Sequence, residues 1–161
     1  MILPLLLGLL SPAPLALHAA PAVHSVLVQD DEFPDKRADV KEWLSTLKGL
    51  IGKRGDEDPA AIALIEKLAG EFQESGKKDR AAIAKGVAAS LSQRRKELSK
   101  DVPDNGLKLA AAKALGSMGP ESTSALSKWV DDKKVRDNLE LQRELVLSLG
   151  STKDMKATKT L

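Results

Sequence analysis

Apolar side chains recur every three or four positions along most of the chain from residue 35 onward, with polar side chains between them. This spacing places the apolar residues on one side of an α-helix, which turns once in about 3.6 residues. Glycine, proline and aspartate interrupt the pattern at intervals and mark the helix ends. The pattern predicts helices at residues 35–51, 58–75, 78–99, 105–117, 120–131 and 139–150, with no strand between residues 35 and 150.

The composition favours the same all-α fold class. Aromatic residues make up only 2% of the 161 residues, and there is no tyrosine. Strands usually draw on aromatic and β-branched residues, whereas the alanine, leucine, lysine and glutamate that dominate here are strong helix formers. The length suits one domain. The residues expected to face its core include Leu47, Ile65, Ile83, Leu115 and Leu126.

The segment 107–131 predicts two short helices joined by a tight turn. Gly116 and Gly119 end the first helix, and Pro120 begins the second. Two helices with so short a connection must lie roughly antiparallel. Because alanine occupies much of the first helix, the two backbones can approach closely, and the pair needs a neighbour to cover its remaining apolar face.

That neighbour follows in the sequence as a second copy of the pattern. The Leu-Gly-Ser endings at 115–117 and 149–151 are offset by 34 residues, and the LKL and LEL starts at Leu107 and Leu139 by 32 residues. A period in this range is typical of proteins built from stacked helical hairpins.

The run "DNGLKLAAAKALGSMGPESTSAL" followed by "LQRELVLSLGS" resembles HEAT-type repeats of the alanine-rich bacterial kind. The likeness is good over residues 104–154 and loose over 35–100, and the block at 79–91 lacks the terminal Leu-Gly. The resemblance implies a short right-handed α-solenoid of antiparallel hairpins that acts as a protein–protein interaction scaffold. The family has no universal catalytic residues, so the resemblance implies none here.

The N-terminus is typical of a secretory leader. No charged side chain precedes Asp30, and an apolar core is followed by a segment of small residues. We expect a signal peptide at 1–22 with cleavage after Ala22, a linker at 23–34, and a helical-repeat domain at 35–161. The leader lacks the usual basic start, and a membrane-spanning helix is the rival interpretation, which its four prolines disfavour. We therefore expect a periplasmic or secreted protein with no stable membrane span after leader removal.

The sequence lacks the residues that several kinds of site require. The chain has no cysteine, and its only histidine after the leader is His24, so no cysteine or histidine-rich metal site can form. The glycine-rich stretches at Gly49 and Gly70 lack the spacing and the serine or threonine of a phosphate-binding loop. We predict no catalytic, cofactor-binding or metal-binding residues.

Charge is distributed unevenly between neighbouring helices. Residues 56–74 contain six acidic residues and one lysine, whereas residues 77–100 contain eight basic residues and two acidic ones. The simpler interpretation is mutual complementarity of packed helices. The more specific interpretation is that the basic residues form a docking patch for an acidic protein partner. Nucleic acid is disfavoured because no aromatic residue is interleaved for base stacking. The candidate patch consists of Arg94, Arg95, Lys96 and Lys100.

The last predicted helix is apolar around much of its circumference. We expect an exposed apolar end at Leu145, Leu147 and Leu149, through which the chain either self-associates or continues into a longer repeat protein. The interpretation that accounts for most of the pattern is an exported, non-catalytic interaction scaffold. The alternatives are an enzyme on a HEAT-like scaffold, such as a lyase, or the capping or accessory part of a larger exported protein.

Overall fold

The computed structural model describes residues 33–53, 55–93, 97–99, 102–103, 105–136 and 138–159. The predicted signal peptide and almost all of the predicted linker lie outside these ranges. The α-helices are α1 (Ala38–Ile51), α2 (Asp58–Glu71), α3 (Lys77–Ala89), α4 (Gly106–Ser117), α5 (Thr123–Val130), α6 (Lys133–Arg136) and α7 (Leu139–Ser151). The short 3-10 helices are η1 (Ser90–Ser92), η2 (Gly119–Ser122) and η3 (Ala157–Lys159).

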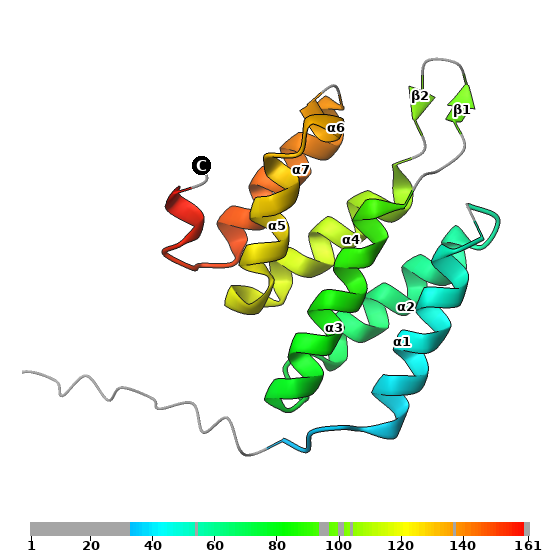
Figure 1. Cartoon of the computed structure of the whole chain (residues 1–161), viewed down its shortest axis with the longest axis vertical. Helices are drawn as coiled ribbons and strands as arrows, with labels where there is room; N and C mark the ends of the chain where they lie inside the picture. Colours follow the sequence, from blue (N-terminus) through cyan, green and yellow to red (C-terminus); the bar gives the residue numbers. More distant parts are fainter. Residues whose placement is uncertain are drawn as a thin grey trace, which may run out of the picture.

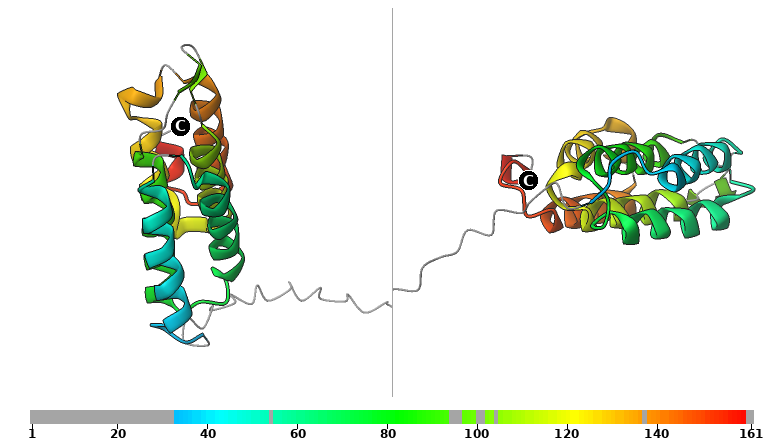
Figure 2. Two further views of the ribbon diagram at one scale, coloured as in Figure 1. Left: turned by 90° about the vertical axis from the view of Figure 1, so that its right-hand side faces the viewer. Right: turned by 90° about the horizontal axis from the view of Figure 1, so that it is seen from below.

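The longer helices form two layers (Figures 1 and 2). One layer contains α1, α3 and α5 side by side, and the other contains α2, α4 and α7. Helices of one layer run in the same direction and helices of the two layers run in opposite directions (Figure 1). Contacts across the layers join α1 to α2, α3 to α4, and α5 to α7. The all-α fold class expected from the sequence is therefore present.

The prediction of no strand is wrong between α3 and α4. There, β1 (Glu97–Ser99) pairs antiparallel with β2 (Val102–Pro103) at one end of the layers (Figure 1). The helix predicted over 78–99 ends at Ala89, and η1 extends it only to Ser92. The Ser92 hydroxyl donates a hydrogen bond to the Ala89 carbonyl, 2.7 Å away. Serine side chains offer the backbone such alternatives to the helical pattern, and they favour helix ends for this reason.

The turn after α4 depends on a glycine and a serine. Gly119 has a φ of 76°, in the left-handed region that glycine adopts without steric cost. The Ser122 hydroxyl donates to the Leu115 carbonyl at 2.6 Å and so satisfies an acceptor at the end of α4. The chain then crosses to the other layer as α5.

Most residues predicted to face the core are buried, among them Leu47, Ile65, Ile83, Leu115 and Leu126. These side chains belong to one continuous core between the two layers. Burial of such apolar surface is the main term that stabilises the fold.

The predicted exposed apolar end is wrong for two of its three residues. Leu145 and Leu149 are fully buried at 0% exposure, and only Leu147, at 55%, faces outward. Leu145 and Leu149 are one helical turn apart, so they share the side of α7 that faces the core. The segment after α7 folds back against it through η3, where Ala157 is buried.

Candidate binding grooves

The two helices that begin with the repeated Asp-Asn sequence lie side by side as α4 and α7. Asn105 and Asn138 stand at their N-caps. The Asn138 amide nitrogen donates to Oδ1 of Asn105 at 2.8 Å, and Oδ1 of Asn138 accepts from the Leu141 backbone N–H at 3.2 Å. Equivalent residues of the two copies, 33 positions apart, therefore touch each other.

Near their other ends, α4 and α7 approach closely through small residues. A Cβ atom added at Gly116 would lie 2.9 Å from the Cα of Ser148. Only glycine fits at that distance, so Gly116 allows the two backbones to pack tightly. We call this contact, from the paired asparagines to Gly116 and Ser148, the α4–α7 seam.

The outer face of the α2, α4 and α7 layer carries two adjoining shallow grooves. One, of about 600 Å³, runs over the α4–α7 seam between Glu144 and Leu147 on one side and Lys113 on the other. The second, of about 470 Å³, lies between α2 and α4, with Ile62 and Glu66 on its α2 side. Lys113 and Ser117 line both grooves.

The other layer has a groove of about 580 Å³ between α3 and α5. We call it the α3–α5 groove. The two tryptophans of the chain lie apart, and Trp129 is the one that lines this groove. Residues from one face of each helix complete the lining, and five of them are alanines: Ala81, Ala84, Lys85, Ala88, Ala89 and Ser92 from α3 and η1, and Glu121, Ser124, Ala125 and Lys128 from η2 and α5.

Charged side chains stand on both sides of the α3–α5 groove. Glu121 lies 3.9 Å from Nε of Arg80, so its charge is directed to α3. Within the described part of the chain, neither Lys85 nor Lys128 forms an ion pair. Both lysines are exposed, and the uncompensated charge at this groove is therefore positive.

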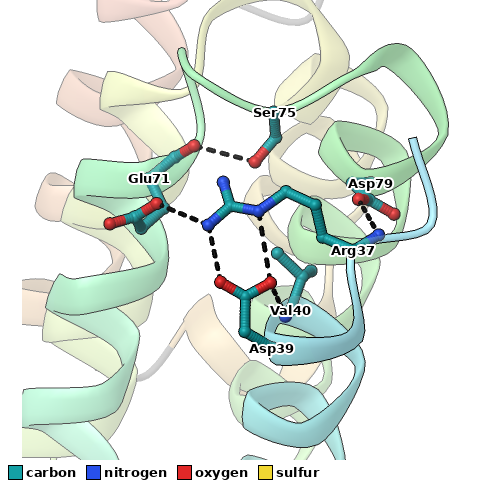
Figure 3. A network of polar contacts seen from close by, with 6 residues as sticks. All are labelled: Arg37, Asp39, Val40, Glu71, Ser75 and Asp79. Carbon is teal, nitrogen blue, oxygen red and sulfur yellow. Dashed lines mark hydrogen bonds and ion pairs between the residues drawn. The ribbon is translucent and has the colours of Figure 1, made fainter. Parts of the chain in front are cut away.

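At the N-terminal ends of α1 and α3, a carboxylate from each segment accepts hydrogen bonds from the backbone of the other; Figure 3 shows Asp79 beside the Arg37 backbone. Asp79, in the first turn of α3, accepts hydrogen bonds from the backbone N–H groups of Lys36 and Arg37 at 3.0 and 2.9 Å. Asp35, before α1, accepts from the Lys78 N–H at 2.7 Å. Asp79 thus satisfies donors at the start of the neighbouring helix α1. Carboxylates at helix N-termini also interact favourably with the helix dipoles.

An arginine completes this corner. Arg37 lies 2.7 Å from Asp39 and 3.0 Å from Glu71 (Figure 3). Hydrogen bonds to Asp39 and then to Glu71 raise the pKa of Arg37, and the bond from Arg37 lowers the pKa of Asp39. With its guanidinium held by two carboxylates, Arg37 ties the segment before α1 to the end of α2. The corner is suited to structural stabilisation.

The candidate docking residues Arg94, Arg95, Lys96 and Lys100 lie outside the described residues. In the sequence the first of them, Arg94, comes two residues after Ser92, which lines the α3–α5 groove. The groove itself is not evident from the sequence. The one sequence feature that accompanies the groove is the spacing of alanines at 81, 84, 88 and 89 along one face of α3. The same spacing would also be expected for a helix face packed against another helix.

Neither the described residues nor the comparisons point to a known chemistry. The described ranges contain no group of three or more acidic or histidine side chains that could hold a metal ion. No helix within them has the length and apolar character needed to cross a membrane. A scan against protein-family models, a search of curated proteins and a search of solved structures found no match.

Proposed function

We propose that this chain is an exported, non-catalytic helical-repeat protein of the HEAT-like type, a short right-handed α-solenoid that acts as a protein–protein interaction scaffold. Export rests on the leader-like N-terminal sequence, and the repeat class rests on the resemblance of residues 104–154. In such proteins each repeat contacts mainly its neighbours, and the exposed helix faces form extended binding surfaces.

The contact between Asn105 and Asn138 is the observation that carries the repeat assignment. In a stack of equivalent units, equivalent residues lie next to each other one repeat apart. The two N-cap asparagines meet at 2.8 Å, and each begins a helix that ends in Leu-Gly-Ser. This arrangement supports the interpretation that the units containing α4 and α7 are successive repeats stacked side by side.

The composition of the grooves supports binding to a protein surface. The grooves on both layers are lined by small and apolar side chains, with lysine and glutamate at their edges. Protein interfaces have this organisation, with an apolar centre and a polar rim.

Site-specific photo-cross-linking in the native host tests the scaffold function. A photoreactive benzoylphenylalanine at position 113, which lines both grooves of the α2, α4 and α7 layer, should yield a discrete cross-linked product with another protein. The matched control is the same substitution at Lys48, which is exposed on α1 and lines no groove described above. Absence of a product at 113, or the same products from both positions, would contradict the proposal.

Export has its own test. N-terminal sequencing of protein recovered from outside the cytoplasm should begin at Val23, after removal of residues 1–22. Recovery of the chain with Met1 intact in the membrane fraction would favour an anchor instead.

A further inference from the structure

The α3–α5 groove is an unusual place for so many alanines. Alanine faces normally allow two helices to pack closely, as α4 packs on α7. The alanines at 81, 84, 88 and 89 share one face of α3, yet they line an open groove. The groove above them has a volume of about 580 Å³, with Trp129 at its α5 side.

The size of the groove suits a helix of another protein. Its α3 side runs from Ala81 to Ser92, which corresponds to about 17 Å along the helix axis. Three turns of an approaching helix span this length. A floor of alanines leaves room for larger apolar side chains supplied by the partner, and Trp129 gives them an aromatic wall.

The charges at the groove select the partner's chemistry. Lys85 stands on the α3 side and Lys128 on the α5 side, and neither forms an ion pair within the described residues. The groove's one lining carboxylate, on Glu121, is directed to Arg80. A partner with carboxylates beside both lysines would complete the electrostatics, because complementary charge across an interface sets partner choice.

We propose that the α3–α5 groove binds an acidic amphipathic helix of another protein. The partner helix lays apolar side chains at i, i+3, i+4 and i+7 against the alanines and Trp129, and its carboxylates lie beside Lys85 and Lys128. This inference rests on the proposed scaffold function and names the class of partner for one of its surfaces.

A designed peptide tests the inference. The probe is an 18-residue, fluorescein-labelled helical peptide with leucine at i, i+3, i+4 and i+7 and glutamate on the other faces. Fluorescence anisotropy with the full chain should show binding that weakens as salt is added. A peptide with lysine in place of glutamate should bind at least tenfold more weakly, because it repels both lysines.

Variants of the chain locate the site. The double substitution Lys85→Glu and Lys128→Glu, at exposed unpaired positions, should weaken binding of the acidic peptide at least tenfold. The control Lys48→Glu, exposed on α1 and outside every groove described above, should leave it within twofold. Ala89→Arg, which places a long side chain in the groove, should also weaken binding, while far-ultraviolet circular dichroism reports that each variant keeps its helices.

Three outcomes overturn the inference. Equal binding to the double variant would remove the lysines from the site, and equal loss with Lys48→Glu would make the attraction non-specific. Binding that appears only after deletion of residues 23–32 would make the chain's own acidic stretch, Asp30–Glu32, the occupant. The cross-linking experiment at position 113 is independent of these outcomes. Failure of this inference therefore does not contradict the scaffold function.

Discussion

The α4–α7 seam and the α3–α5 groove lie between helices of the same direction, each within one layer. In the seam the two helices pack closely beneath the groove that runs over them, whereas α3 and α5 contact each other little. In the seam, Gly116 places no side chain between the helices, and Ser148 lies directly against its backbone. In the groove, Trp129, Lys85 and Lys128 line the space between α3 and α5 together with the alanines of α3. A high alanine content therefore permits close packing, but the largest side chain in the contact decides the spacing.

The ends of the helices reinforce this difference. The N-caps of α4 and α7 are joined directly through Asn105 and Asn138. In the other layer, reciprocal carboxylates join α1 to α3, whereas the contact between α3 and η2 is a long ion pair from Arg80 to Glu121 at 3.9 Å. α3 and α5 are thus the least tightly joined of these neighbouring helix pairs.

Removal of a core side chain beneath the closed seam should have the largest effect. Leu115 is fully buried on α4. Leu115→Ala should lower the free energy of unfolding by about 3 kcal/mol, since it loses burial and leaves a cavity. Urea denaturation followed by circular dichroism measures this. The control Lys113→Ala, exposed on the same helix, should change it by less than about 0.5 kcal/mol. Equal destabilisation by the two substitutions would show that Leu115 does not lie on the side of α4 that faces the core.

Filling the seam should have the next largest effect. Gly116→Ala places a Cβ 2.9 Å from both Cα and Cβ of Ser148, so the helices must move apart. We expect a loss of about 1–3 kcal/mol in the free energy of unfolding.

Gly150 provides the matched control for that substitution, because it holds the same position in the Leu-Gly-Ser ending of α7. A Cβ there would meet nothing within 4 Å. Gly150→Ala should therefore be neutral or stabilising by up to about 1 kcal/mol. If both alanine variants have the same stability, the seam is not closed.

The sequence predicts much of this fold and little of its surface. Helical spacing locates α1, α2, α4 and α7 to within a few residues, because each buries one regular face. It fails after α3, where apolar Leu91 and Leu98 continue the spacing although serine ends the helix. It also misses α6, whose only apolar residue is Val135. The α3–α5 groove depends on which helices become neighbours, and local spacing cannot specify that.

Loss of the cap that joins α1 to α3 should have a moderate effect. Asp79→Ala removes the acceptor of the Lys36 and Arg37 backbone N–H groups. We expect a loss of about 1–2 kcal/mol in the free energy of unfolding, measured by the same denaturation. Asp131→Ala, an exposed aspartate after α5, is the control and should be nearly neutral. A neutral Asp79→Ala would mean that these bonds do not hold the layer.

The smallest effect concerns pH. The pKa of Asp39 is lowered in the folded protein by its hydrogen bond from Arg37. Its stabilising contribution is therefore present above the unfolded pKa of about 4 and is lost as pH falls through the lower folded value. Asp39→Asn should flatten the fall in melting temperature below about pH 4. An unchanged acid profile would contradict the role of this pair.

Alanine methyl groups report directly on the contrast between the two helix pairs. In two-dimensional methyl NMR with alanine-labelled protein, addition of the acidic amphipathic peptide should shift the methyl signals of Ala81, Ala84, Ala88, Ala89 and Ala125, which line the α3–α5 groove. The signals of Ala111 and Ala112, buried in α4, should stay in place. Shifts confined to α4, or spread evenly over both sets, would contradict the account of a binding groove between the loosely packed α3 and α5 and a tightly packed contact between α4 and α7.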